Sequence, residues 1–414
     1  MTPVAKKRLM MLVKLTVCVI AVWYLSGKIT INDYVRLKDS PKVRHLLVRE
    51  VGENLLIRDA ATGGEREVRQ SDLATQEQLG RDEHPIEYGL RYVLRSTEWS
   101  WAGLALLAMS PATFVIAWRL RLLLSAQNIG LSMRDAILLS FAGNFFNFAM
   151  PGTTGGDLYK AYHIAKQTHK RAEGVTIVFL DRVIGLISFL LLATAAIFVS
   201  WGKDIIGIYG KWVGYLMVAF IIGCGFYFSR RVRRWIRYDF LLRKLPFGDK
   251  LQRIDDTVFN FRYHPGKTTL AVAVSIGLHL LCVVSLYCLA RGLGIEPGPT
   301  RSYGDLYLAC LLCFVVGYLF AAIPISFQGI GILEAVFYRV LVTGEWCSPN
   351  QMIAMTIGIR IIQIVWSLPG IAVPWLGFQR PPGQTAEEAL EAAEAPSDAG
   401  VVAGQEGPSA LAGK

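Results

Sequence analysis

Long apolar runs separated by short polar segments dominate the pattern along this chain. Several of these runs approach or exceed the ~20 residues that a helix needs to cross a bilayer. They cover about 9–25, 99–118, 175–201, 212–228, 268–289 and 352–376. The pattern therefore predicts an all-α polytopic membrane protein with about six full spans.

A polar stretch, residues 26–97, follows the first apolar run. Within it, "HLLVREVGENLLIRDAATGGEREVRQSDL" alternates apolar and polar residues, with breaks at 52–54 and at 63–64. Such alternation is typical of short strands joined in hairpins. We expect four parts: a membrane anchor helix at 1–25, a small β-containing extracytoplasmic module at 26–97, a transmembrane domain at 98–378, and a cytoplasmic tail at 379–414. The tail is rich in Ala, Gly, Pro and Glu and is expected to be disordered.

Basic segments indicate the orientation of the chain. "YKAYHIAKQTHKR" and "SRRVRRWIRYDFLLRK" are strongly basic, whereas the turns near 202 and 294 carry few, balanced charges. Cytoplasmic loops carry an excess of Lys and Arg, so the N-terminus and both basic loops are expected in the cytoplasm, with the protein spanning the cell membrane. The net charge of +11 is thus interpreted as a topology signal, and a nucleic-acid partner is not expected.

The apolar run at 135–150 is only about 16 residues long and lies between basic clusters that should share one side. A re-entrant hairpin with its tip at 151–156 resolves this conflict. A second break interrupts the apolar pattern of 302–343, and "GNFFNFAMPGTTGGDLYK" parallels "GYLFAAIPISFQGIGILE". Two re-entrant hairpins in corresponding places suggest an inverted repeat with a site near the membrane midplane; chance similarity of two short segments is the alternative.

Charged residues lie inside the apolar runs. Asp181, Arg182 and Arg360 fall within predicted spans, where a charge at the bilayer centre costs ~2.5–3.5 kcal/mol. Asp157 and Glu334 follow the two glycine-containing turns and are the expected partners of the arginines. The alternative is that these charges form structural salt bridges that only hold helices together. Arg119 and Arg121, by contrast, are expected to snorkel at a membrane edge.

The two turns have the features of an anion site. Backbone N–H groups at a helix start attract anions, and helices are expected to begin at 155–157 and at 328–331. Thr153 and Thr154 offer hydroxyls, while Lys160, Arg182 and Arg360 add positive charge. This set suits a lipid headgroup that carries a phosphate. Cys310 and Cys313 form a CxxC without nearby histidines, so we expect packing rather than a metal or redox role, and no cofactor.

Four motifs in order, "NFAMPGTTGGDLYKAYHIAK", "FLDRVIGL", "PISFQGIGILEA" and "IGIRIIQ", resemble those of the transmembrane region of lysylphosphatidylglycerol synthetases, a flippase-like integral membrane family. The resemblance covers about 99–376. It implies the handling of phospholipids or polyprenyl-linked lipids, with headgroup translocation as the leading idea. The resemblance carries over Pro151, Gly155, Gly156, Asp157, Asp181, Arg182, Glu334 and Arg360. The full set of expected headgroup-binding residues adds Asn147, Gly152, Thr153, Thr154, Lys160, Gln328, Gly329 and Gly331.

The chain departs from the family pattern at several points. Lys160 stands where the family often has arginine, which keeps the charge but loses bidentate phosphate binding. Leu333 replaces an arginine that often precedes Glu334. The insertion at 26–97 is not part of the common pattern, and the soluble aminoacyl-transfer domain of the full-length synthetases is not found here, so the sequence is not expected to be a complete synthetase.

Three functions remain open from the sequence. The first is a non-enzymatic translocase that moves or binds anionic phospholipid or polyprenyl-phosphate lipids. The second is the membrane component of a lipid glycosyl- or aminoacyl-transfer system. The third is an accessory protein that binds an envelope partner through the module at 26–97.

Overall fold

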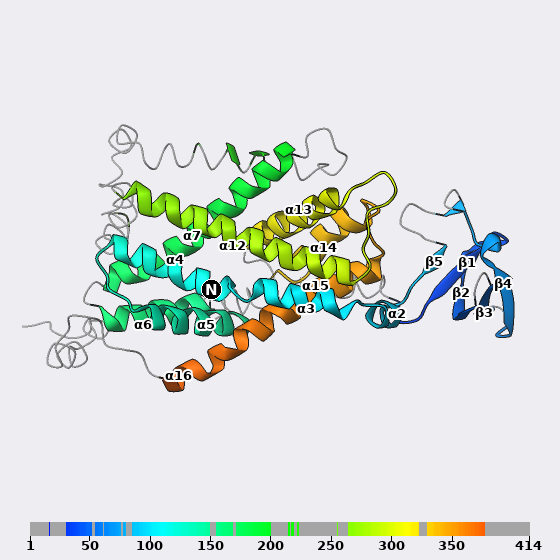
Figure 1. The fold of residues 1–414 in the computed structure, drawn as a ribbon, viewed down its shortest axis with the longest axis horizontal. Coiled ribbons are helices and arrows are strands. Elements are labelled where there is room, and N and C mark those ends of the chain that lie inside the picture. The colour runs from blue at the N-terminus through cyan, green and yellow to red at the C-terminus, as the bar shows by residue number, and fades with distance from the viewer. Residues whose placement is uncertain are drawn as a thin grey trace, which may run out of the picture.

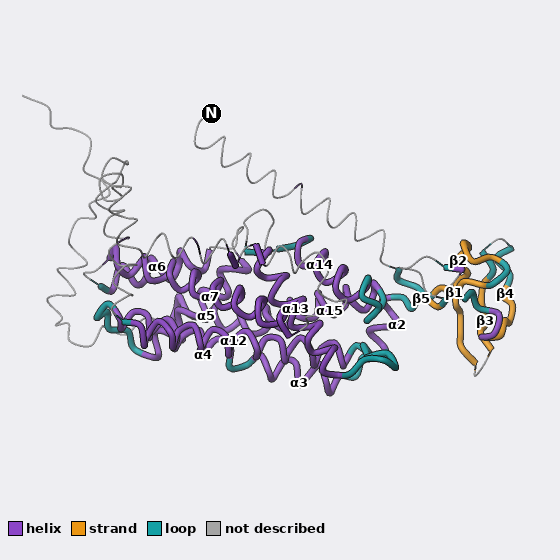
Figure 2. The backbone as a smooth tube through the Cα atoms, turned by 90° about the horizontal axis from the view of Figure 1, so that it is seen from above, coloured by secondary structure: helices purple, strands orange, loops and turns teal. Residues whose placement is uncertain are grey.

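The computed structural model describes residues 30–51, 54–60, 62–75, 78–79, 85–149, 155–168, 171–199, 264–322 and 329–376, with a few isolated positions elsewhere. These residues form an elongated helical bundle with a small β-sheet beyond one end (Figures 1 and 2). The predicted spans at 9–25 and 212–228 and the tail at 379–414 lie outside the described residues, apart from the isolated positions. So do both predicted hairpin tips, with Pro151, Gly152, Thr153, Thr154 and Gln328.

Five helical segments of the described chain are long and apolar enough to cross a membrane. They are Trp99–Ala126, formed by α3 (Trp99–Met109) and α4 (Ala112–Ala126); Ala172–Val199 of α7 (Arg171–Val199); α12 (Pro265–Gly292); α13 (Tyr303–Ala321); and Pro349–Leu376, formed by α15 (Pro349–Ser367), η6 (Leu368–Ala372) and α16 (Val373–Leu376). Four of the five coincide with predicted spans. The prediction of an all-α polytopic membrane protein is confirmed.

The antiparallel pair formed by α3–α4 and α12 defines the two ends of the bundle. Lys267 Nζ, at the start of α12, donates to the backbone oxygen of Ser125 at 2.8 Å. At the opposite end, the N–H of Glu98 donates to the backbone oxygen of Gly292 at 2.8 Å. We refer to these as the Ser125 end and the Gly292 end. The chain enters the next helix, α5, from the Ser125 end.

The first predicted hairpin consists of α5 (Met133–Ala149) and α6 (Gly155–Gln167), which lie side by side (Figures 1 and 2). Their backbones touch where Gly156 meets Gly143. A Cβ on Gly156 would overlap the carbonyl oxygen of Gly143, so only glycine permits this approach. The N–H of Gly156 donates to Asn147 Oδ1 at 2.9 Å, which ties the start of α6 back to α5.

The second hairpin consists of α13, followed by α14 (Ile332–Phe337) and the π-helical turn η5 (Tyr338–Val342). Arg301 Nη1 donates to the backbone oxygen of Gly344 at 2.7 Å, so the chain enters and leaves this hairpin at one place. Gln351 Nε2 donates to the backbone oxygen of Leu293 at 3.1 Å, which locates that place at the Gly292 end. The two hairpins therefore enter the bundle from opposite ends, as an inverted repeat requires.

The first arm of the second hairpin is long. Helix α13 has 19 residues and qualifies as a candidate span by length and composition. The return of the chain depends on glycine, because Gly329 and Gly331 have φ values of 72° and 88°, in the left-handed region. A Cβ on Gly317 would lie 2.7 Å from Leu333 Cδ1, so α13 and α14 are closely packed after the turn.

The predicted strands are confirmed as a five-stranded antiparallel sheet of order β4-β3-β2-β1-β5. The strands are β1 (Tyr34–Leu37), β2 (Ser40–Val51), β3 (Asn54–Arg58), β4 (Glu65–Arg69) and β5 (Ile86–Glu87). Val35, Leu37, Leu47, Leu55 and Ile57 form its small core. The short helix α2 (Leu90–Arg95) connects the sheet to α3.

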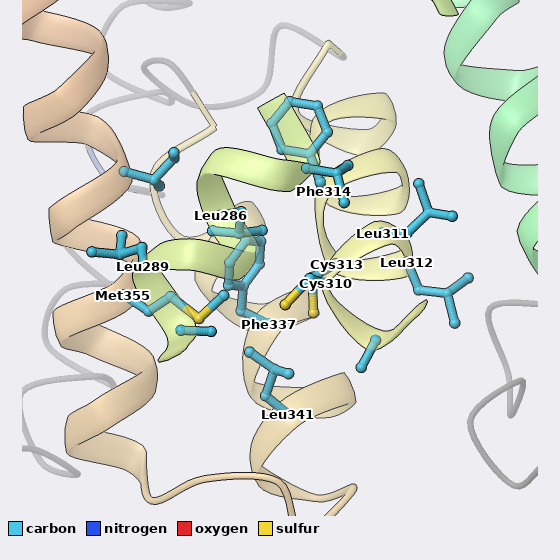
Figure 3. Close-up of a cluster of buried hydrophobic side chains, with 14 of the residues drawn as sticks. Leu286, Leu289, Cys310, Leu311, Leu312, Cys313, Phe314, Phe337, Leu341 and Met355 are labelled. Atoms are coloured by element: carbon cyan, nitrogen blue, oxygen red, sulfur yellow. The ribbon is translucent and has the colours of Figure 1, made fainter. Parts of the chain in front are cut away.

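The largest apolar cluster lies in the half of the bundle near the Gly292 end. Figure 3 shows Cys310 and Cys313 side by side, among Leu286, Phe337 and Leu341. Both thiols are fully buried in this cluster, so the expected packing role is confirmed.

Candidate functional site

A cavity of about 400 Å³ lies between the two hairpins and the long helices α4, α7, α12 and α15. Most of its wall is apolar, but charged and polar side chains converge on it. The lining residues with charged side chains are Arg119, Asp181, Arg182 and Arg360, and those with neutral polar side chains are Asn144, Asn147, His279, Tyr318 and Gln363. A pocket of this size with few, convergent polar groups is typical of a ligand site.

The deepest charged pair joins α4 to α7. Arg119 Nε and Nη2 donate to the two carboxylate oxygens of Asp181 at 2.7 and 3.0 Å, and Arg119 Nη1 donates to Ser275 Oγ at 2.7 Å. Arg119 is 7% exposed and Asp181 is 6% exposed, so both charges are buried. Bidentate pairing with an additional hydroxyl partner is what allows a guanidinium to remain there.

This pair corrects the prediction that Arg119 snorkels at a membrane edge. The helix does not end at residue 118, as expected, but continues to Ala126, and Arg119 faces the interior. Arg121 is exposed, and its snorkelling role stays a prediction. The sequence did carry a signal for such a pair. Asp181 cannot pair with the adjacent Arg182 on a helix, so it required a basic partner from another span.

The second ion pair joins the first hairpin to α7. Arg182 Nε contacts Asp157 Oδ2, and the carboxylate belongs to the first turn of α6. The Arg182 side chain is 34% exposed and that of Asp157 is 21% exposed. This pair is therefore more exposed than the Arg119–Asp181 pair, and its arginine lines the cavity.

The third ion pair joins the second hairpin to α15. Arg360 Nη2 donates to Glu334 Oε1 at 2.9 Å. Glu334 Oε2 accepts the N–H of Gly331 at 2.7 Å, so the carboxylate also caps the start of α14. The predicted pairing of the arginines with Asp157 and Glu334 is thus confirmed, although its role in ligand binding stays a prediction.

The second and third pairs occupy equivalent places in the two hairpins. Each carboxylate is the third residue of the helix that returns from the turn, α6 or α14. Each arginine belongs to the next long helix, since Arg182 follows Asp157 by 25 residues and Arg360 follows Glu334 by 26. This correspondence favours an internal repeat over chance similarity of the two turns.

An aromatic wall adjoins the ion pairs. The rings of Phe189 and His279 stack with centroids 3.7 Å apart, and Tyr318 lies parallel to Phe189 at 6.3 Å. Gln363 Nε2 donates to the Tyr318 hydroxyl at 2.7 Å, and His279 Nε2 lies 3.3 Å from the backbone oxygen of Gly185. The sequence prediction missed this wall, although a histidine within the apolar run of α12 was a signal for it.

The remaining predicted residues divide into two groups. Asn147 lines the cavity, and Gly155, Gly156, Gly329 and Gly331 shape the starts of α6 and α14. Lys160 is 4% exposed and lies beside α5, outside the cavity lining. Leu333, in the place of an arginine of the resembled pattern, lines the cavity with an apolar side chain.

Comparison with models of protein families relates this chain to a known family. The family described as "Lysylphosphatidylglycerol synthase TM region" matches residues 89–370, which is more than half of the chain. A search of curated proteins gave no match. The matched region contains both hairpins, all three ion pairs and the whole cavity lining, but not the β-sheet module.

Proposed function

Because the chain belongs to the lysylphosphatidylglycerol synthase TM-region family, and is therefore a multi-pass membrane protein of lipid-related processes, we propose that it moves lipid headgroups across the membrane through this cavity. The observation that carries the proposal is the set of ion pairs on the cavity wall. Arg182 and Arg360 are both partly exposed and line the cavity. Charged groups at membrane depth normally mark a substrate path.

The size and chemistry of the cavity suit a headgroup rather than a whole lipid. A volume of about 400 Å³ holds a phosphate and a small polar group, while the acyl chains remain in the bilayer. Guanidinium groups are favourable partners of phosphate oxygens because they offer several N–H donors. The apolar and aromatic part of the wall excludes bulk water, which strengthens these contacts.

The two hairpins provide a route from one face of the membrane to the other. They enter from opposite ends and each contributes one carboxylate to an ion pair on the cavity wall. In transporters with inverted repeats, the site stays near the midplane and the two halves alternate in closing it. The protein thus acts as a non-enzymatic carrier of anionic phospholipid or polyprenyl-phosphate lipids, in the inner membrane.

The test is a flipping assay with the full chain in vesicles that contain a headgroup-labelled phosphatidylglycerol. A membrane-impermeant quencher, added outside, reports the labelled headgroups that reach the outer leaflet. We expect the quencher to reach the label of inner-leaflet lipids much faster in vesicles with the wild-type protein than in empty vesicles. We expect the double variant Arg182→Gln/Arg360→Gln to lose most of this rate, about tenfold or more.

Arg121→Gln is the matched control, because this arginine is exposed on α4 and does not line the cavity. It should flip the lipid as the wild type does. If the wild type does not exceed empty vesicles for anionic phospholipid or polyprenyl phosphate, the proposed function is wrong.

A second candidate is an accessory role through the β-sheet module. One observation favours it: Asn350 Nδ2, at the start of α15, donates to Thr30 Oγ1 and to the backbone oxygen of Tyr88, both at 2.8 Å. Because α15 also carries Arg360, a partner bound to the module would act on the helix that lines the cavity. An envelope protein cross-linked to the module in cells, together with an absence of flipping, would support this second role.

A further inference from the structure

One face of α7 changes from exposed to buried halfway along the helix. Residues at spacings of three and four share a face of a helix. In chain order, this row consists of Val175, Phe179, Arg182, Leu186, Leu190 and Ala193. The apolar side chains of its first half, Val175, Phe179 and Leu186, are 45, 63 and 38% exposed. Leu190 and Ala193 are 6 and 0% exposed, so the α7 row is covered only beyond Leu186.

The two halves of the α7 row belong to different halves of the bundle. Leu190 and Ala193 are part of the large apolar cluster near the Gly292 end, which also contains Phe314 of α13. The first half of α7 packs through another face, since Ile177 belongs to a second cluster that includes Ala126 at the Ser125 end. The bundle is therefore closed over the α7 row on the Gly292 side and leaves the row exposed on the Ser125 side.

The exposed half of the α7 row reaches the cavity. Arg182 and Leu186 belong to this row and also line the cavity. The Arg182 side chain is 34% exposed, although α7 is long and apolar enough to cross a membrane. A charged side chain in a spanning helix normally faces the bundle interior or a polar cavity, not the lipid. An arginine of the cavity wall in an otherwise apolar, exposed row indicates that the cavity opens sideways here.

The first hairpin forms the other border of this opening. Asp157, the partner of Arg182, belongs to the first turn of α6. Leu158, next to it, is 68% exposed, and Tyr162, one turn further along α6, is 63% exposed. Both helices therefore present large apolar side chains on either side of the ion pair. An apolar border favours contact with hydrocarbon over contact with water.

We propose that the exposed half of the α7 row, together with Leu158 of α6, is a lateral entrance to the cavity that an acyl chain of a bilayer lipid occupies. The chain lies against Phe179 and Leu186, outside the bundle, while the headgroup enters the cavity beside Arg182. The entrance is on the Ser125 side, so lipids of the leaflet at that end use it. This inference rests on the proposed function for its role and specifies how a lipid reaches the cavity.

The first test locates the chain directly. The full-length protein is placed in vesicles with a trace of a phosphatidylglycerol that carries a diazirine at the end of one acyl chain. After illumination, mass spectrometry locates the adducts. We expect the yield at Phe179 and Leu186 to exceed that at Leu104 and Leu107 about fivefold or more. These two leucines are exposed on α3 and do not line the cavity, so they report ordinary lipid contact.

The second test narrows the entrance. Leu186→Trp places a larger side chain at the edge of the cavity, at a position that is not part of the buried core. We expect it to lower both the adduct yield on α7 and the flipping of labelled phosphatidylglycerol about fivefold or more. Leu191→Trp is the matched control, because Leu191 is 40% exposed on the same helix but does not line the cavity. Melting temperatures establish that both variants are folded.

The outcomes separate this inference from the proposed function. Equal adduct yields on α7 and α3 would show ordinary lipid contact only and overturn the entrance. Normal flipping by a folded Leu186→Trp variant, with a wild type that flips, overturns the entrance and leaves the proposed function standing. Adducts on α7 that Leu186→Trp removes, in a wild type that does not flip the lipid, support the bound chain and defeat the proposed function.

Discussion

At the scale of single residues, the protein places three arginine–carboxylate pairs in the interior of a largely apolar bundle. The pairs differ in accessibility. Arg119 and Asp181 are both less than a tenth exposed, whereas the Arg182 side chain is 34% exposed. Buried pairs mainly hold structure, because their desolvation offsets much of their attraction. The more exposed pairs are the ones that we propose as ligand contacts.

The Arg119–Asp181 pair is predicted to be structural. Asp181→Asn leaves the buried guanidinium of Arg119 without its counter-charge and should destabilise the fold by about 3–5 kcal/mol. Removing both charges with Arg119→Met/Asp181→Leu should recover most of this loss. Denaturation in detergent measures both effects, with Arg121→Ala as an exposed control within ~0.5 kcal/mol of the wild type. A stable Asp181→Asn would contradict the assignment.

The Arg182–Asp157 pair is predicted to serve transport as well as structure. Each single variant, Arg182→Asp or Asp157→Arg, brings two like charges together and should lower stability by about 1 kcal/mol. The double exchange restores the pair and therefore the stability. Flipping of labelled phosphatidylglycerol should stay low in the double variant, since the guanidinium has moved from α7 to α6. Full recovery of flipping would show that the pair is only a salt bridge.

The sequence was informative about these residues where a charge interrupts an apolar run. Asp181, Arg182 and Arg360 were identifiable on that basis, and the partners Asp157 and Glu334 followed from the turns. Arg119 was misjudged because Arg121, two residues on, made the segment look like the end of a span. Tyr318 was not identified because its hydroxyl adds no charge to an apolar run. His279 was missed, although an ionisable side chain within an apolar run indicates a polar contact.

At the scale of elements, the two hairpins depend on glycine at their closest contacts. Gly156 touches the backbone of Gly143, and Gly329 and Gly331 turn the chain into α14 with left-handed φ values. These contacts set the depth at which α6 and α14 begin, and so the positions of Asp157 and Glu334. The first hairpin was predictable because a short apolar run lay between two basic segments, and the second because a similar break interrupts the apolar pattern of 302–343.

Gly156→Ala is predicted to separate α5 from α6. The added Cβ would overlap a backbone carbonyl, which cannot move as a side chain can, so we expect a loss of about 3 kcal/mol and strongly reduced flipping. Gly277→Ala is the matched control, since nothing lies within 4 Å of its added Cβ in α12. That variant should be as stable as the wild type or slightly more so. Thermal melting and the flipping assay distinguish the two variants, and equal behaviour would contradict the close contact.

The length of α13 could not be predicted from its composition alone. Both a span and a hairpin arm are apolar throughout, so the hydrophobic pattern does not distinguish them. The hydrogen bond between Arg301 and the backbone of Gly344 identifies α13 as a hairpin arm, because it joins the two outer ends of the hairpin. Such a contact connects residues more than forty positions apart and leaves no periodic signal.

At the scale of the whole molecule, a β-sheet module is joined to a bundle whose two hairpins enter from opposite ends (Figure 1). The order of these parts was readable from alternation and apolar runs. The attachment of the module was not, because it includes long-range contacts such as those of the Asn350 side chain, which is 4% exposed.

Asn350→Leu is predicted to loosen the module. It removes the donors to Thr30 Oγ1 and the Tyr88 carbonyl, and the acceptor for the N–H of Thr30, a loss of about 1–3 kcal/mol for buried partners. Limited proteolysis between residues 88 and 98 should become several-fold faster, while the bundle keeps its melting temperature. The control is Asn54→Ala, an exposed change in β3, which should be cleaved at the same rate as the wild type. Equal cleavage rates would place the attachment elsewhere.

The central claim is that headgroups pass through the cavity, and blocking the cavity tests it most directly. A Cβ on Gly185, in the cavity wall, would lie 3.7 Å from Arg119 Nη1, an ordinary contact, so Gly185→Cys should fold. Gly64→Cys, exposed in the module, is the control. After reaction with a charged, membrane-impermeant thiol reagent, we predict that flipping of labelled phosphatidylglycerol stops for Gly185→Cys and continues for Gly64→Cys. Flipping that continues with the Gly185→Cys thiol fully modified would contradict the account.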